Sequence, residues 1–99
     1  MATLYRVMQA SSLVCACDNI EVQPKNGEDF SLEELQGFVN GYIEVVQLKD
    51  DKIMVVNEEG KLHGLRFNVG ATLAYNEGTG RYDDIILGNA LVCKKEEVK

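Results

Sequence analysis

Two runs of β-branched and aromatic residues, separated by a short charged turn, constrain the fold of this chain more than any other feature. Residues 42–48 read YIEVVQL and residues 52–57 read KIMVVN, with Lys49, Asp50 and Asp51 between them. Such residues favour extended strands, and a short polar connection returns the second strand antiparallel to the first. The sequence therefore predicts a hairpin at the centre of an antiparallel sheet.

The clearest helix signal begins at Ser31. Ser31 is a favourable N-cap residue, and Glu34 three residues later completes a capping box. Apolar residues at helical spacing follow, which predicts a helix over residues 32 to about 40. Gly41 then occupies the position at which a left-handed residue commonly ends a helix.

A second helix is predicted after Asn68, which can cap residues 69 to about 76. Apolar residues in this segment give the helix one face that can pack. Shorter extended runs predict further strands at residues 4–8, 19–23, 61–65 and 90–93.

Length and composition indicate one α+β domain over residues 1–99. The chain is 45% hydrophobic and 26% charged, as globular proteins commonly are. We expect a mainly antiparallel sheet of about four to six strands with two helices, followed by a flexible, solvated tail at residues 94–99. The expected core residues are Leu35, Phe38, Val45, Val46, Met54, Val55, Leu65, Leu73, Ile86 and Leu91.

The charge balance is acidic, with 10 Lys+Arg against 16 Asp+Glu and a formal net charge of −6. An acidic protein repels phosphate backbones, so we expect no general nucleic-acid binding. The sequence shows no signal peptide and no apolar stretch long enough to span a bilayer. We therefore expect a cytoplasmic protein that does not interact with membranes.

The three cysteines, Cys15, Cys17 and Cys93, allow two interpretations. Together with His63 they could form a Cys3His zinc site, although the C-x-C spacing matches structural zinc sites loosely. The favoured interpretation is three small hydrophobic side chains in a reducing compartment, with no metal or cofactor.

No known catalytic motif is present, and His63 is the only histidine. The most informative polar stretch is residues 57–68, where polar side chains surround Gly60 and Gly64. Such a stretch can hold an anionic or planar polar ligand, but the same residues also suit a hairpin loop and a helix cap. The candidate ligand-binding residues are Asn57, Lys61, His63, Arg66, Asn68, Arg81 and Tyr82.

Several blocks of the sequence resemble one family. They are GYIEVV at residues 41–46, NEEGKL at residues 57–62, and DII with GNALV at residues 84–86 and 88–92. These blocks resemble domain of unknown function 3846, a family met in bacteriophages, plasmids and bacterial genomes that carry mobile elements. The resemblance covers about residues 20–93 and brings no established reaction.

The resemblance implies a small accessory protein of a phage or mobile element that acts by binding and is not an enzyme. The favoured hypothesis is counter-defence in the host cytoplasm by sequestering a small anionic or nucleotide-like ligand. The alternatives are an inhibitor that binds a host defence protein directly, and a structural domain. Exposed strand edges would also allow the chain to form a homo-oligomer.

Overall fold

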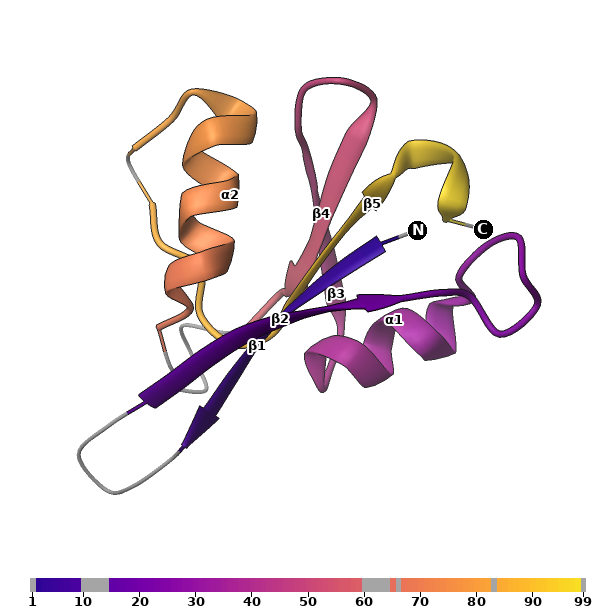
Figure 1. Ribbon diagram of the computed structural model, residues 1–99, viewed down its shortest axis with the longest axis horizontal. Helices are drawn as coiled ribbons and strands as arrows, with labels where there is room; N and C mark the ends of the chain where they lie inside the picture. The colour runs from indigo at the N-terminus through magenta and orange to yellow at the C-terminus, as the bar shows by residue number, and fades with distance from the viewer. Residues whose placement is uncertain (1, 10–14, 60–64, 66, 83, 99) are drawn as a thin grey trace.

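The computed structural model of the chain describes residues 2–9, 15–59, 65, 67–82 and 84–98. Within these ranges, five strands form one antiparallel sheet and two α-helices pack against it (Figure 1). The structure thus confirms the predicted α+β class. No helix in the described part of the chain is long and apolar enough to cross a membrane.

The sheet has the strand order β2-β1-β5-β4-β3, so the last strand of the chain lies at its centre. β1 pairs with β5 only over Thr3 to Tyr5, and the far part of the β1–β2 hairpin therefore projects from the body of the molecule (Figure 1). The predicted strand at residues 61–65 falls almost entirely outside the described residues. The strands are β1 (Ala2–Gln9), β2 (Cys15–Val22), β3 (Ile43–Gln47), β4 (Lys52–Asn57) and β5 (Ala90–Lys94).

Both faces of the sheet are covered, one by each helix (Figure 1). Successive side chains of a strand point to opposite faces, so the interior strand β4 contributes to two separate cores. Ile53 and Val55 pack on the face covered by α1 (Leu32–Val39), together with Phe30, Leu35 and Leu91. Met54 and Val56 pack on the face covered by α2 (Val69–Thr79), together with Leu48, Ala71, Tyr75, Ile86 and Ala90.

The N-terminus of α1 has the predicted capping box. The Ser31 Oγ accepts a hydrogen bond from the Glu34 backbone N–H at 3.2 Å, and the Glu34 carboxylate accepts one from the Ser31 N–H at 3.1 Å. At the C-terminus, however, the left-handed residue is Asn40, with φ of 62°, and not Gly41 as predicted. Gly41 serves another purpose, because a Cβ there would lie 2.8 Å from the Asn57 amide nitrogen.

The second helix, α2, begins as predicted after Asn68, whose side chain accepts a hydrogen bond from the Ala71 N–H at 3.0 Å. It continues to Thr79, three residues beyond the predicted end at residue 76. Gly80 ends it in the left-handed conformation, with φ of 71°. Two hydrogen bonds hold the added turn: the Thr79 Oγ1 donates to the Tyr75 carbonyl at 2.7 Å, and the Lys49 N–H donates to the Gly78 carbonyl at 2.9 Å.

The end of the chain is structured where a solvated tail was expected. β5 extends through Lys94, a 3-10 helix η1 covers Lys95–Glu97, and Val98 forms a parallel bridge with Phe30. The Phe30 N–H donates to the Glu97 carbonyl at 2.7 Å, and the Phe30 side chain is completely buried. The charged residues at the end of the chain predict a solvated tail when they are considered alone. The tail is ordered because it contacts Phe30, which lies far away in the sequence.

Two expected core residues lie at the surface instead. Val45 is 50% exposed because β3 is an edge strand, and Leu73 is 61% exposed because it lies on the outer side of α2. Phe38, Val46 and Leu65 are partly buried. The remaining predicted core residues are buried, namely Leu35, Met54, Val55, Ile86 and Leu91.

Candidate functional site

A concavity of the described surface follows the edge strand β3 on the face of the sheet that α2 covers. It consists of two adjoining hollows of about 450 and 660 Å³ that share Val46 and Arg81. We call this surface the β3 groove. Its lining comes from β3 and the end of β4, from the C-terminal end of α2, and from the segment that follows α2. The lining residues are Glu44–Gln47, Lys49, Val56–Glu59, Tyr75, Gly78–Arg81 and Asp84–Leu87.

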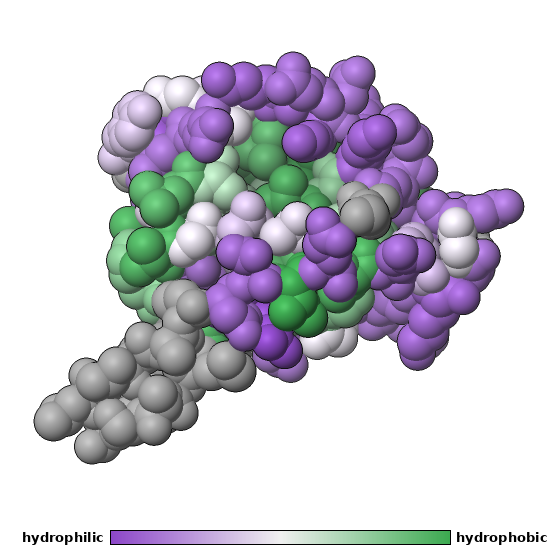
Figure 2. All heavy atoms as spheres, in the orientation of Figure 1, coloured by the Kyte–Doolittle hydropathy of each residue, from purple (hydrophilic) through white to green (hydrophobic). Residues whose placement is uncertain are grey.

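The floor of the groove is apolar and its rim is charged. Val46 and Val56 come from neighbouring strands, and Ile86 reaches the same floor from the segment after α2. Figure 2 shows apolar surface in the middle of the molecule and on the side where α2 lies, with hydrophilic surface surrounding it. A surface of this kind can hold an extended or amphipathic ligand, because the floor contributes apolar contact and the rim fixes orientation.

Carboxylates predominate among the described residues of the rim. Among the described residues that line the 450 Å³ hollow, Glu44, Glu58, Glu59 and Asp84 carry carboxylates, and Arg81 carries a guanidinium. Lys49 adds a second cation in the adjoining hollow. This part of the groove therefore favours a cationic ligand over an anionic one.

Large apolar side chains lie exposed beside the groove. Ile85 in the lining of the groove is 47% exposed, and Val45 on β3, the strand along which the groove runs, is 50% exposed. Tyr82, next to Arg81 in the chain, is 79% exposed. Exposed apolar side chains that gather around a concave, charged surface are typical of protein interaction sites.

Asn57, one of the predicted ligand-binding residues, lines the groove, but its amide is already engaged. The Nδ2 donates to the Val39 carbonyl at 2.9 Å, and the Oδ1 accepts from the Glu59 N–H at 2.8 Å. These bonds fasten the C-terminal end of α1 to the end of β4. The nearby glycine at position 41 permits this close approach.

Asn68, the second predicted asparagine, does not line the β3 groove and is completely buried. Its Nδ2 donates to the carbonyls of Tyr5 and Gly88 at 3.1 and 2.9 Å, while its Oδ1 caps α2 through Ala71. The side chain thus joins β1, α2 and the segment before β5. Its geometry is that of a structural residue.

The other predicted residues divide into two groups. Lys61, His63 and Arg66 lie outside the described residues. Arg81 lines both hollows of the β3 groove, and Tyr82 follows it on the exposed loop. The structure therefore brings Asn57 and Arg81 to one surface and places Asn68 elsewhere.

Sequence reasoning missed the residues that give the groove its character, above all Glu44, Val45 and Ile85. Glu44 and Val45 belong to a run that resembles an ordinary core strand, and Ile85 belongs to an ordinary short apolar run. The charge of Glu44 within YIEVVQL was the one available signal, since such alternation indicates a strand with one solvated face. It does not show that β3 lies at the edge of the sheet.

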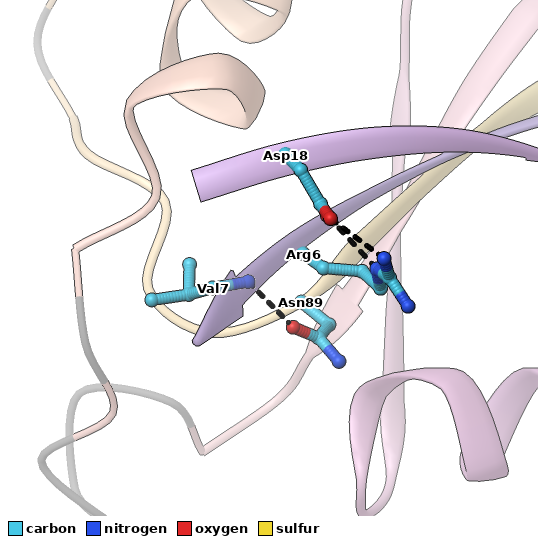
Figure 3. Close-up of polar contacts among 4 residues, drawn as sticks. All are labelled: Arg6, Val7, Asp18 and Asn89. Carbon is cyan, nitrogen blue, oxygen red and sulfur yellow. Dashed lines mark hydrogen bonds and ion pairs between the residues drawn. The ribbon is translucent and has the colours of Figure 1, made fainter. Parts of the chain in front are cut away.

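A separate polar cluster holds the projecting β1–β2 hairpin (Figure 3). Arg6 on β1 binds both carboxylate oxygens of Asp18 on β2, at 2.8 and 2.6 Å. This pairing raises the pKa of Arg6 and lowers the pKa of Asp18. Close by, the Asn89 Oδ1 accepts a hydrogen bond from the Val7 N–H at 3.0 Å, so the hairpin is tied to the start of β5.

Cys93 is the cysteine whose side chain lies in the described part of the chain, and its burial makes the thiol a poor nucleophile. Cys93 is buried in the core beneath α1, and burial raises the pKa of its thiol to about 11. The side chains of Cys15 and Cys17 lie outside the described part, as does His63, so the loose Cys3His hypothesis concerns residues that the structure does not describe. Among the described residues, no group of three or more His, Cys, Asp or Glu could hold a metal ion.

Comparison with known proteins identifies the family. The sequence model of a domain of unknown function, DUF3846, matches residues 13–99. Because the match spans most of the chain, the protein belongs to this family. No curated protein and no solved structure matches the chain.

Proposed function

We propose that this member of the DUF3846 family is a non-catalytic binding protein that holds a protein partner against the β3 groove. One observation supports the proposal above all. Half-exposed Ile85 lines the groove together with the apolar floor of Val46 and Val56, next to the carboxylates of its rim. Apolar contact area combined with a polar rim is the usual composition of a protein–protein interface.

The charge of the groove favours a protein over the small anionic or nucleotide-like ligand that the sequence suggested first. Glu44 and Glu58 are exposed at the rim and would repel phosphate groups. The amides of Asn57 and Asn68, which were candidates for binding such a ligand, already form hydrogen bonds within the protein. Arg81 is the described candidate residue whose positive charge could still attract an anion.

We extend the proposal to the biological setting that the family resemblance implies. The protein would act in a bacterial cytoplasm as an accessory factor of a phage or mobile element, and its partner would be a host defence protein. A small protein can block a larger one by covering its working surface, so this activity needs no chemistry in the groove.

Site-specific photo-crosslinking tests the proposal. A photoreactive phenylalanine analogue replaces Tyr82, which is exposed beside the groove, and in a matched control it replaces Glu33, which is exposed on α1 across the sheet. After irradiation in bacterial cells, we expect a discrete protein adduct with the Tyr82 variant and not with the Glu33 variant. Equal adducts at both positions, or no protein adduct at Tyr82, would contradict the proposal.

A further inference from the structure

We infer that the partner contributes a basic, extended segment, which adds to the sheet as a further strand along the free edge of β3. This inference rests on the proposed function and specifies its mode of binding. Strand addition to an exposed sheet edge is a common way for proteins to recognise extended segments, because backbone hydrogen bonds supply affinity and alternate side chains supply specificity.

The register of the β3–β4 hairpin shows which backbone groups are available at this edge. The Glu58 N–H donates to the Tyr42 carbonyl, and the Leu48 N–H donates to the Lys52 carbonyl, both at 2.9 Å. Residues of an antiparallel strand bond alternately to the two sides, so even-numbered residues of β3 bond to β4. The N–H and C=O groups of the odd-numbered residues, Ile43, Val45 and Gln47, therefore point away from β4.

These outward groups form no hydrogen bond to another described residue, because β3 is the last strand of the sheet and pairs with β4 alone. Five residues of strand thus present three evenly spaced pairs of donors and acceptors. An unprotected edge of this kind invites pairing with another strand.

The side chains along the edge indicate which segment would fit. Val45 is opposite Val55 and so projects on the α1 face, where it is half exposed. Glu44 is opposite Val56 and so projects on the α2 face, beside Glu58. A segment that alternates apolar and basic residues would cover Val45 with its apolar side and meet the two carboxylates with its basic side.

The same charges argue against a second copy of this chain as the occupant. Each chain has a formal net charge of −6, and pairing β3 with another β3 would place the carboxylates of the rim near their own counterparts. Like charges that meet across paired strands destabilise the pairing. The carboxylates of the rim would instead attract the Lys or Arg side chains of a basic segment.

Two synthetic peptides provide the test, an acetylated and amidated heptapeptide of alternating Lys and Val, and its Glu–Val counterpart. Amide hydrogen exchange, measured by NMR on the whole protein, separates the two sets of β3 amides. We expect saturable binding of the Lys–Val peptide, with new protection at Ile43, Val45 and Gln47, since Glu44 and Val46 already bond to β4. The Glu–Val peptide should bind at least about tenfold more weakly.

Paired variants at Val45 isolate the backbone contribution. Val45→Pro removes an outward N–H and leaves the bonds to β4 in place, which an edge strand can accept. Val45→Thr keeps the N–H and suits a strand. Binding of the Lys–Val peptide should be lost with Val45→Pro and retained with Val45→Thr, while both variants give the circular dichroism spectrum of the folded protein. Glu44→Lys should weaken the Lys–Val peptide and strengthen the Glu–Val peptide.

Each contrary result overturns a stated part of the inference. Absence of Lys–Val binding, or binding without protection of the outward amides, would exclude strand addition. Protection that rises with protein concentration and needs no peptide would identify a second copy as the occupant. A groove-specific crosslink at Tyr82 together with failed peptide binding would leave the proposed function standing and refute only the inferred mode.

Discussion

Replacing Asn68 with alanine should destabilise the protein strongly, although the sequence marked this residue as a candidate for ligand binding. The amide is completely buried and makes three hydrogen bonds with backbone groups of three segments. Loss of a helix cap costs about 1 kcal/mol. Removing the donor from the buried Gly88 carbonyl and from the partly buried Tyr5 carbonyl costs about 1 kcal/mol for each.

These contributions add to about 3 kcal/mol in the free energy of unfolding for Asn68→Ala. For a domain of this size, that corresponds to a fall of about 12–24 °C in Tm. Urea denaturation followed by circular dichroism measures the change directly. Asn19→Ala, an exposed position on β2, serves as the control and should change the free energy by less than about 0.5 kcal/mol. An Asn68→Ala protein within about 1 kcal/mol of the parent would refute the structural role.

Three further predictions concern local features of the fold. Gly88→Ala should cost about 2–3 kcal/mol in urea denaturation, because φ is +80° and the new Cβ would lie 2.7 Å from Leu65; an unchanged midpoint would exclude that close packing. Hydrogen bonds from the Ser31 and Lys25 N–H groups lower the pKa of Glu34 below its ordinary 4.5. The ionised Glu34 carboxylate therefore stabilises the folded protein fully above pH 4.5, and this stabilisation is lost as the pH falls through the pKa of Glu34 in the folded protein. The Glu34→Gln variant should therefore lose less stability on acidification, and equal pH profiles would contradict this. Cys93, with a pKa of about 11, should resist iodoacetamide at pH 8 until the protein unfolds, as peptide mass mapping would show; rapid labelling of the native protein would contradict its burial.

The local elements could be predicted because local chemistry determines them. Ser31 and Glu34 form reciprocal hydrogen bonds within one turn of helix. The short charged turn between β3 and β4 brings the two strands into antiparallel pairing. The class of fold follows from such elements, because strands that alternate and one capped helix already require a sheet with a covered face.

Neither the strand order nor the side on which α2 packs could be predicted, and the errors at Val45 and Leu73 follow from these two features. Both residues have the spacing of core residues, yet one lies at a sheet edge and the other on the outside of α2. Which strand takes the edge depends on contacts between residues far apart in sequence, such as the pairing of β1 with β5. The final residues illustrate the same point, since Phe30 decides the position of Val98.

The candidate site was predicted only in part for a similar reason. A list of polar residues from one stretch cannot distinguish an amide that bonds within the protein, as that of Asn68 does, from one that faces a ligand. Arg81 lines both hollows of the β3 groove, and its role in ligand binding stays a prediction. The carboxylates and valines of the groove became visible only when β3 was placed at the edge.

Native mass spectrometry of the protein isolated from bacterial cells tests the central claim most directly, because it reports protein partners and retained small molecules together. We predict a complex whose added mass is that of another protein, and we predict that Val45→Pro reduces it. A retained mass of a few hundred daltons that disappears on denaturation would contradict the account and support sequestration of a small ligand instead.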